Sequence, residues 1–168
     1  MIIGILSDTH LAAPDERLER LLAVTLADAE VLLHAGDHTG DAVIEYLQYD
    51  EPRPYYGVAG NMDLGRQGQS LPARRLVRVA GLTIGLIHGW GAPTGLEQRV
   101  LSAFDPAVDV VVYGHSHHPG ARRVDGRCLL NPGSAFHPRG PGRGSVAVLL
   151  AGGDRPAVEF REVVGGHG

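Results

Sequence analysis

The sequence predicts an α/β protein in which two mixed β-sheets pack face to face between outer layers of helices. Two observations support this four-layer α-β-β-α sandwich. The first half of the chain alternates apolar runs with amphipathic segments, an order that favours parallel strands joined by crossover helices. The second half is rich in strand-like runs separated by tight turns, which favours added antiparallel strands. We expect one domain over residues 1–164 and a flexible tail at 165–168.

The first half of the chain contains three apolar runs, and we expect buried strands at 2–6, 31–33 and 55–58. Pro14 suits the first turn of a helix between the first two strands. One apolar face of this helix would consist of Leu18, Leu21, Leu22 and Leu26. A second helix is expected over 41–49, so that both helices cover a parallel sheet.

The second half of the chain is dominated by predicted strands. Hairpins are expected around Ala80-Gly81 and around Asp125-Gly126, and the Asp-Gly pair is the strongest hairpin signal in the sequence. The predicted strands are 76–79, 82–87, 110–112, 122–124, 127–130, 146–150 and 157–163. A third helix is expected over 95–104, and the Gly/Pro-rich segment 132–144 is long enough to be a functional loop.

Five of these strands end in Asp, His or Asn, at the edge where an open α/β sheet binds ligands. The residues at these ends are Asp8, His10, Asp37, Asn61, His88, His115 and His117. Seven nitrogen and oxygen ligands are too many for one structural zinc, which takes four. They suit two metals about 4 Å apart that share one carboxylate. This mixture favours Mn, Fe, Co, Ni or Zn over Mg.

Composition excludes several classes of function. The net charge of −4 carries no electrostatic signature of nucleic-acid binding. All 15 basic residues are Arg, so a phosphate could meet only guanidinium groups, and lysine Schiff-base chemistry and a Walker-type loop are excluded. The single Cys128 rules out an internal disulfide. Without a leader or an apolar stretch of about 18 residues, we expect a cytoplasmic protein with no membrane partner.

The order of the polar motifs resembles a known superfamily. Asp-x-His, Gly-Asp, Gly-Asn-x-Asp, His-Gly and Gly-His-x-His follow one another between Asp8 and His117. In this order and spacing they resemble the calcineurin-like metallophosphoesterases, and the short chain resembles their small bacterial and archaeal phosphodiesterase branch. That branch also carries the Asn-Pro-Gly-Ser sequence found here at 131–134. A retromer subunit is similar in fold.

The resemblance implies the four-layer sandwich, a dinuclear metal centre and hydrolysis of phosphodiesters by a hydroxide that bridges the metals and attacks phosphorus directly. It implies that one metal is held by Asp8, His10 and His117, the other by Asn61, His88 and His115, and both by Asp37. Asp37, Asn61 and His115 are expected to be catalytic as well. Mn²⁺ is the expected metal, with Ni²⁺, Fe²⁺, Co²⁺ and Zn²⁺ as alternatives.

Met62 departs from the pattern of many larger members, which place a histidine after the Asn as the acid for the leaving oxygen. A thioether cannot donate a proton, which argues against fast cleavage of esters with poor leaving groups. His38 and His118 are the candidate substitutes and are expected on the substrate side. Arg139 is the preferred phosphate-binding guanidinium. Asp63 is expected to orient a ligand or cap a loop rather than bind metal.

Several features near the site remain open in the sequence. Trp90 either lines the pocket or packs beneath its loop, and the loops 65–71 and 136–144 are expected to shape the pocket. His34 is expected to be a hydrogen-bonded core histidine, and His137 an ordinary loop residue.

Two alternatives to a phosphodiesterase come from the same residues. A non-catalytic metal-binding scaffold for protein partners would explain Met62, although the complete ligand set favours an enzyme. A phosphomonoesterase would need extra cations for the second negative charge, and only Arg139 and its neighbours offer them. The expected partners are a small phosphodiester and further copies of the chain in a homodimer or homotetramer.

Overall fold

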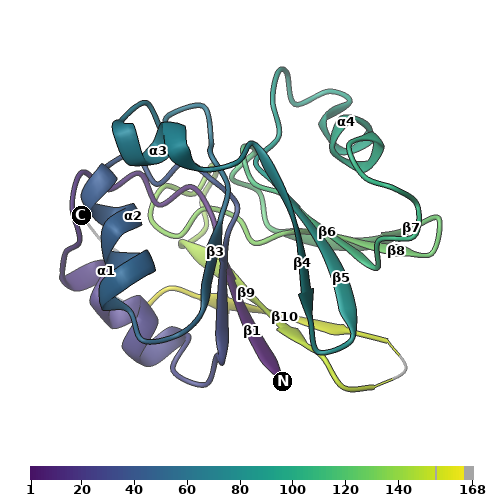
Figure 1. Ribbon diagram of the computed structural model, residues 1–168, viewed down its shortest axis with the longest axis horizontal. Coiled ribbons are helices and arrows are strands. Elements are labelled where there is room, and N and C mark those ends of the chain that lie inside the picture. The colour runs from purple at the N-terminus through teal and green to yellow at the C-terminus, as the bar shows by residue number, and fades with distance from the viewer. Residues whose placement is uncertain (154, 165–168) are drawn as a thin grey trace.

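A computed structural model describes residues 1–153 and 155–164, and it contains two five-stranded sheets packed face to face (Figure 1). The first sheet has the strand order β10-β9-β1-β2-β3, and the second has the order β4-β5-β6-β8-β7. The first sheet comprises β1 (Ile2–Leu6), β2 (Val31–His34), β3 (Tyr55–Gly57), β9 (Ser145–Leu150) and β10 (Ala157–Glu162). The second comprises β4 (Arg74–Val79), β5 (Leu82–Ile87), β6 (Val110–Val112), β7 (Gly120–Val124) and β8 (Arg127–Asn131).

Both sheets are mixed, as the sequence predicts. Strands β1, β2 and β3 are parallel, and β9 and β10 extend this sheet as antiparallel strands. In the second sheet β5, β6 and β8 are parallel, while β4 and β7 are antiparallel edge strands. The turn between β7 and β8 has positive φ angles at Asp125 and Gly126 (50° and 83°), as a two-residue hairpin turn of this kind requires. The tail predicted at 165–168 lies outside the described residues.

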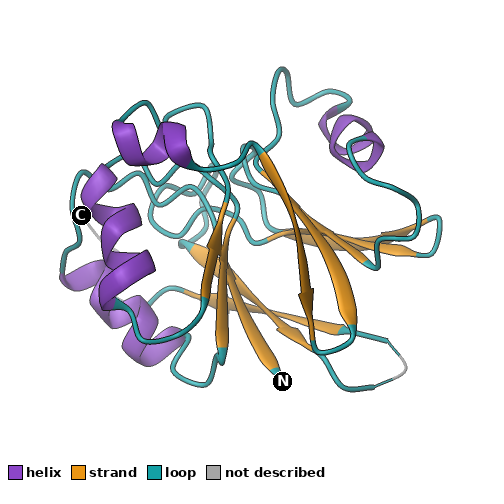
Figure 2. Cartoon of the chain, viewed as in Figure 1, coloured by secondary structure: helices purple, strands orange, loops and turns teal. Residues whose placement is uncertain are grey.

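Helices cover the outer face of each sheet, which completes the predicted four layers (Figure 2). The helical segments are α1 (Glu16–Arg20), η1 (Leu21–Thr25), α2 (Asp41–Glu45), η2 (Tyr46–Asp50), α3 (Arg66–Ser70) and α4 (Leu96–Ser102). Asp15 caps α1 by accepting hydrogen bonds from the backbone of Arg17 and Leu18. The chain then continues without a break into the wider turns of η1. The predicted apolar face of this helix is confirmed, since all four of its leucines are buried.

The main core lies between the two sheets, and the alternation of strand side chains explains it. Val110 and Val112 of β6 point into this core, whereas Val111 points outward and packs with α4. All three are fully buried. A buried valine contributes roughly 1.5–3 kcal/mol, so this strand is strongly fixed in register. Its carboxyl end therefore has a well-defined position.

The described fold differs from the predicted elements in one segment near the site. The predicted loop at 65–71 contains the short helix α3. A carboxylate oxygen of Asp41 accepts hydrogen bonds from the backbone N–H groups of Gln67 and Gly68, at 3.0 and 3.2 Å. These bonds satisfy free N–H groups at the start of the helix. The residues of α3 show no apolar periodicity from which a helix could be predicted. The contact that stabilises α3 comes from Asp41 on another helix.

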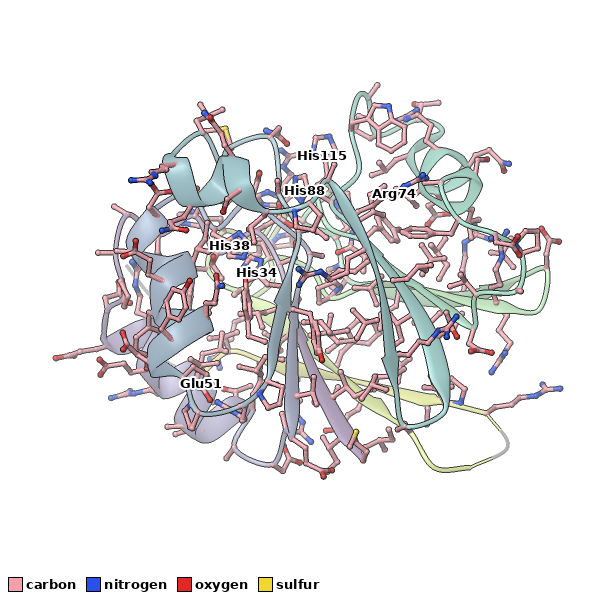
Figure 3. The ribbon with its side chains drawn as sticks, viewed as in Figure 1. His34, His38, Glu51, Arg74, His88 and His115 are labelled. Atoms are coloured by element: carbon pink, nitrogen blue, oxygen red, sulfur yellow. The ribbon has the colours of Figure 1, made fainter. Side chains whose placement is uncertain are left out.

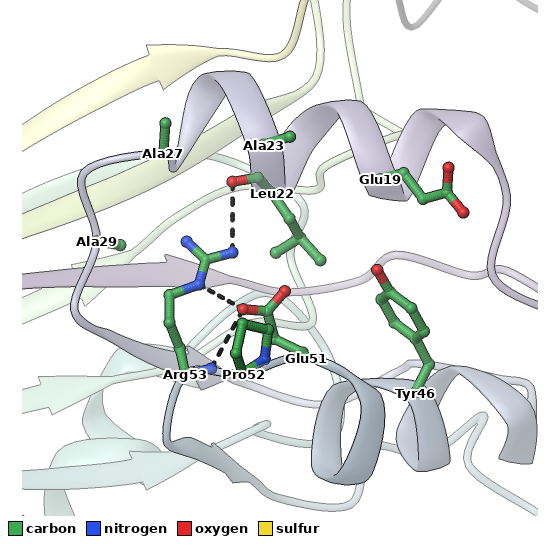
Figure 4. Close-up of a pocket in the computed structure, with 9 residues that line it drawn as sticks. All are labelled: Glu19, Leu22, Ala23, Ala27, Ala29, Tyr46, Glu51, Pro52 and Arg53. Atoms are coloured by element: carbon green, nitrogen blue, oxygen red, sulfur yellow. Dashed lines mark hydrogen bonds and ion pairs between the residues drawn. The ribbon is translucent and has the colours of Figure 1, made fainter.

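Arg53 fastens the helical layer to the loop before β3 (Figure 4). Its guanidinium donates to the backbone oxygens of Leu22 and Leu26 at the end of η1, at 3.3 and 2.6 Å. Its Nε donates to Glu51 at 2.5 Å. A cavity of about 680 Å³ lies beside these contacts and includes none of the predicted metal ligands.

None of the described helices is long and apolar enough to cross a membrane.

We expect Arg53→Ala to lower the free energy of unfolding by about 1–3 kcal/mol, because it leaves helix-end carbonyls and the Glu51 carboxylate without their partner. Urea unfolding followed by circular dichroism measures the change. Arg20→Ala is the control, since Arg20 is exposed on the same helical layer and should change the value by less than about 0.5 kcal/mol. Equal stability of Arg53→Ala and the wild type would contradict the fastening role.

Candidate metal centre

The seven predicted ligands come together at the carboxyl ends of strands from both sheets. Three strands of the first sheet contribute Asp8, His10, Asp37 and Asn61, and two strands of the second contribute His88, His115 and His117. Figure 3 shows His88 and His115 at this end of the molecule, above His38 and His34. The centre therefore lies at the seam between the sheets.

The first group of ligands gathers around one oxygen of Asp8. Nε2 of His117 lies 3.2 Å from Oδ1 of Asp8, and Nε2 of His10 lies 3.9 Å from the same oxygen. The two Nε2 atoms are 3.3 Å apart. These three residues are close enough to hold one cation, as the resemblance implies for Asp8, His10 and His117.

The second group gathers around Asn61 and His88. The side-chain oxygen of Asn61 lies 3.2 Å from Nε2 of His88 and 3.1 Å from Nδ1 of His115. Oδ2 of Asp37 lies 3.4 Å from Nε2 of His88 and 3.7 Å from Nε2 of His10, which belongs to the first group. Asp37 thus lies between the two groups. Oδ1 of Asp8 is also within 4.0 Å of His88, so both carboxylates border both groups.

The outer nitrogens of the four imidazoles have partners that set their orientation. Nδ1 of His88 donates to the Ala35 carbonyl at 2.7 Å, and Nδ1 of His117 donates to the His137 carbonyl at 2.6 Å. Nε2 of His115 donates to the Gly91 carbonyl at 2.9 Å. Nδ1 of His10 lies 3.2 Å from the Thr39 hydroxyl. A donated proton on the outer nitrogen leaves a lone pair on the inner one, as metal ligation requires.

In each of the two carboxylates, hydrogen bonds from the protein hold one oxygen, and the other oxygen faces the remaining ligands. Oδ2 of Asp8 accepts from the Ser7 hydroxyl and the His115 backbone N–H, at 2.6 and 3.1 Å. Oδ1 of Asp37 accepts from the Met62 backbone N–H at 2.8 Å. Oδ1 of Asp8 is buried and makes no hydrogen bond to any residue that the structure describes. A buried carboxylate oxygen without a donor is costly, and a cation would satisfy it. The residues present therefore fit divalent metal ions.

The backbone conformation of the predicted ligands is a second, independent indication that they form a functional site. Five of the predicted ligands have positive φ angles, between 47° and 68°. These are Asp8, His10, Asp37, His115 and His117. Left-handed conformation costs an ordinary residue roughly 1–2 kcal/mol, and such strain concentrates at functional sites.

The charges at the centre favour positive partners. Burial would lower the pKa of His88, but the carboxylates of Asp37 and Asp8 outweigh it and raise this pKa. Contact with Asp8 raises the pKa of His117, although burial opposes the rise. Burial holds the pKa of His10 below its ordinary value despite the same carboxylates. The field that draws protons to His88 and His117 is the field that would hold a cation.

Asp63 orients the centre from beneath. Its carboxylate accepts from the backbone N–H groups of Asp37, Thr39 and Gly60, at 2.9, 2.8 and 2.8 Å. Burial alone would raise the pKa of Asp63, but its contact with His38 and these backbone bonds hold it well below its ordinary range. Asp63 thus fixes the loops that carry Asp37 and Asn61.

The prediction that His38 contacts substrate is wrong in this structure. His38 is fully buried, with Nδ1 3.0 Å from Asp63 and Nε2 2.6 Å from the hydroxyl of Tyr55. Its ring stacks on His34 at 3.6 Å between centroids. With both nitrogens engaged and no exposed surface, His38 cannot reach a leaving group. His34 is the hydrogen-bonded core histidine that the sequence predicts, and it contacts Thr9 and the Gly36 N–H.

The remaining predicted substrate groups lie at the rim. His118 and Arg139 are exposed, and the positive charge of Arg139 acts to lower the pKa of His117, a small effect beside the contact with Asp8 that raises it. Nδ1 of His118 donates to the carbonyl of Ser116 at 2.7 Å, and Nε2 has no hydrogen-bond partner in the described part of the chain. The Met62 side chain is 44% exposed. His137, expected as a loop residue, contributes its carbonyl to His117.

Sequence reasoning missed the residues that brace the ligand loops. The Ser134 hydroxyl donates to the backbone oxygen of Asp8 at 2.6 Å. The side-chain amide of Asn131 donates to the Gly114 carbonyl and the Ser116 hydroxyl. The sequence signal for these residues is the Asn-Pro-Gly-Ser motif at 131–134, which is part of the resemblance and for which no role is predicted. At Gly114, a Cβ would lie 2.1 Å from the Ser7 hydroxyl, so glycine is needed there for space.

Comparison with known proteins identifies the family. A family model described as a calcineurin-like phosphoesterase superfamily domain matches residues 1–153. A probable metallophosphoesterase of Methanothermobacter thermautotrophicus is 35% identical over 140 residues, which cover 83% of this chain and 80% of that protein. The chain belongs to the calcineurin-like phosphoesterase superfamily.

Solved structures share the fold of this chain over nearly its whole length. Vacuolar protein sorting 29 of Cryptosporidium parvum matches with a TM-score of 0.75 and 22% identity, over 99% of this chain and 93% of that one. A protein described as an archaeal phosphodiesterase matches with a TM-score of 0.69 and 22% identity, over 96% and 100%. At this identity the likeness concerns the fold, and it confirms the predicted sandwich.

We expect Asp37→Ala to abolish metal binding by both groups of ligands, because one carboxylate oxygen of Asp37 borders both groups. Metal content measured by mass spectrometry after gel filtration tests this, with circular dichroism to confirm folding. Asp37→Asn, which keeps an oxygen for the Met62 N–H, should fold and still bind metal weakly. Asp50→Ala is the control at an exposed carboxylate. Two retained ions in Asp37→Ala would show that Asp37 is not shared.

Proposed function

We propose that this protein is a metal-dependent phosphodiesterase whose centre holds two divalent metal ions, with Mn²⁺ as the expected metal. The observation that carries the proposal is the convergence of carboxylate oxygens and imidazole nitrogens at one point. Oδ2 of Asp37 lies within 3.7 Å of His10 and 3.4 Å of His88, so one carboxylate oxygen faces both ligand groups. When bound, the ions would supply hydroxide near neutral pH for direct attack on phosphorus, and positive charge for the phosphoryl oxygens.

In this scheme the protein's own residues position the metal ions and orient the ligand side chains. Asp8 and Asp37 supply negative charge, and the hydrogen bonds on the outer nitrogens keep the histidines turned inward. Asn61 adds a neutral oxygen between His88 and His115. No covalent phospho-enzyme is needed, because the side chains at the centre are all committed as ligands.

Charge favours diesters over monoesters at this centre. A monoester brings two negative charges toward the carboxylates of Asp8 and Asp37, whereas a diester brings one. Arg139 is an exposed cation whose charge acts on His117, a predicted ligand. We propose that Arg139 binds the phosphoryl group from the rim, by charge-assisted hydrogen bonds.

Protonation of the leaving group falls to the rim as well. Met62 has no proton to give, and the burial of His38 removes it from the reaction. His118 is exposed, and its Nε2 has no hydrogen-bond partner among the described residues, so we propose it as the acid that protonates strongly basic, poor leaving groups.

A non-catalytic scaffold is the second candidate function, and Met62 is the feature that favours it. A scaffold has no need of a leaving-group acid. A complete set of ligand atoms with prepared lone pairs favours the enzyme, because binding to protein partners does not require that arrangement.

Hydrolysis assays with metal-stripped protein decide between these functions. We expect an aryl phosphodiester to be cleaved faster than its monoester when Mn²⁺, Ni²⁺ or Zn²⁺ is added, and Asp37→Ala to abolish cleavage. Mg²⁺ should support less activity, because the ligands are mixed with nitrogen. Metal binding without cleavage of either ester would reject the enzyme in favour of the scaffold.

We expect Met62→His to raise kcat more for esters with poor leaving groups than for those with good ones. A histidine at this exposed position would supply the missing proton, and general acid catalysis contributes roughly 10²–10⁴-fold where it limits the rate. The measurement is a plot of rate against leaving-group pKa for both proteins. Equal gains across the series, or no gain, would contradict the account.

We also propose that the protein works in the cytoplasm, which the buried free thiol of Cys128 supports. A homodimer or homotetramer is the proposed assembly, and light scattering in solution measures it directly.

A further inference from the structure

An apolar cavity borders the metal centre on the side of the second sheet. Its volume is about 520 Å³, within the range of small-molecule sites. Its wall includes Asn61 and His88, two of the predicted ligands. A substituent on a phosphoryl group bound at the centre would therefore have this cavity as a neighbour.

The lining of the cavity is largely aliphatic and aromatic. Ile87, Ala103 and the half-exposed indole of Trp90 form much of the wall, and the described lining contains no acidic side chain. Of the alternatives for Trp90, the structure shows that it lines a pocket. An exposed tryptophan at the mouth of an apolar cavity offers a flat surface on which a planar ring can stack.

The backbone under Trp90 is fixed although its side chain is exposed. The guanidinium of Arg99 donates twice to the Trp90 carbonyl, at 3.0 and 2.8 Å, and once to the Thr94 carbonyl. The next residue, Gly91, accepts the hydrogen bond from Nε2 of His115. The loop that carries Trp90 is thus hydrogen-bonded to His115, a predicted metal ligand. This contact fixes the position of the loop relative to the centre.

Arg74 adds a polar edge to the same cavity. It pairs with Ile87 across β4 and β5, next to His88, and Figure 3 shows Arg74 and His88 at the same end of these strands. One guanidinium nitrogen donates to the Ala103 carbonyl at 2.5 Å. The side chain is exposed, so its other N–H groups are available to acceptor atoms on the rim of a ring.

We propose that this cavity binds a planar aromatic substituent of the substrate ester, an aryl group or a nucleobase, by stacking on Trp90. The proposal rests on the proposed function, because the phosphoryl group must be held at the metal centre. It deepens that function by naming the substrate class: phosphodiesters of aryl alcohols or nucleosides, rather than of small aliphatic alcohols.

Calorimetric titration of the Mn²⁺-loaded protein with phenylphosphonate and methylphosphonate tests the proposal without relying on turnover. These ligands share the phosphoryl group and differ in the ring. We expect phenylphosphonate to bind about tenfold more tightly, since stacking of one ring on an aromatic side chain is worth roughly five- to 150-fold. Adenosine 5′-monophosphate, tested beside phenyl phosphate, distinguishes a nucleobase from a simple aryl group.

Trp90→Ala should remove the preference for phenylphosphonate and leave the affinity for methylphosphonate unchanged, while Trp90→Phe should keep most of it. Tyr49→Ala is the matched control, because Tyr49 is an aromatic residue that is 70% exposed and does not line the cavity. Trp90 is the single tryptophan of the sequence. Its fluorescence in a Zn²⁺-loaded sample should therefore respond to phenylphosphonate and not to methylphosphonate.

Equal binding of the two phosphonates by the wild type, or a preference that survives in Trp90→Ala, would overturn the assignment and leave the proposed function intact. Binding of neither phosphonate would overturn this inference, whereas the absence of metal-dependent cleavage in the hydrolysis assay would overturn the proposed function.

Discussion

At the centre of this protein, the fold holds close together several atoms that can accept hydrogen bonds or bind metal ions. Carboxylate oxygens of Asp8 and Asp37 and inward-facing nitrogens of four histidines lie within a few ångströms of one another, while their outer atoms carry the hydrogen bonds. Such an arrangement is repulsive unless positive charge is shared within it. Protons on His88 and His117 can supply some of that charge, and divalent ions would supply more.

The remainder of the fold holds this unfavourable arrangement in place. Left-handed backbone at five ligands costs several kcal/mol in sum, and the fully buried residues between the two sheets provide the offsetting free energy. The inter-sheet core matters most, because the ligands come from both sheets. A shift of one sheet against the other would separate His88 and His115 from Asp37 and Asn61.

Beneath the ligands lies a buried polar chain that runs from Tyr55 through His38 to Asp63 and the loop of Asp37. Burial raises the pKa of the Tyr55 hydroxyl well above its ordinary range, so it remains protonated and can hydrogen-bond His38. These buried hydrogen bonds support the loop of Asp37, and in the proposed function the proton for the leaving group comes from exposed groups at the rim. This separation of support from chemistry is consistent with a centre that relies on metal ions.

The sequence by itself determined the layers, and it predicted the set of Asp, His and Asn side chains that the structure brings together. Apolar runs mark the strands, and the carboxyl ends of the parallel strands lie at one edge of each sheet. A residue that directly follows one of these strands is therefore placed at that edge. The leucine face of α1 and η1 and the Asp125-Gly126 turn follow from equally local rules. Only the tertiary structure decided that His38 is buried against Tyr55 and that α3 forms on the Asp41 carboxylate. It also decided that Trp90 lines a cavity with Arg74. These outcomes depend on contacts between residues far apart in the chain, and local periodicity carries no information about which distant side chains meet.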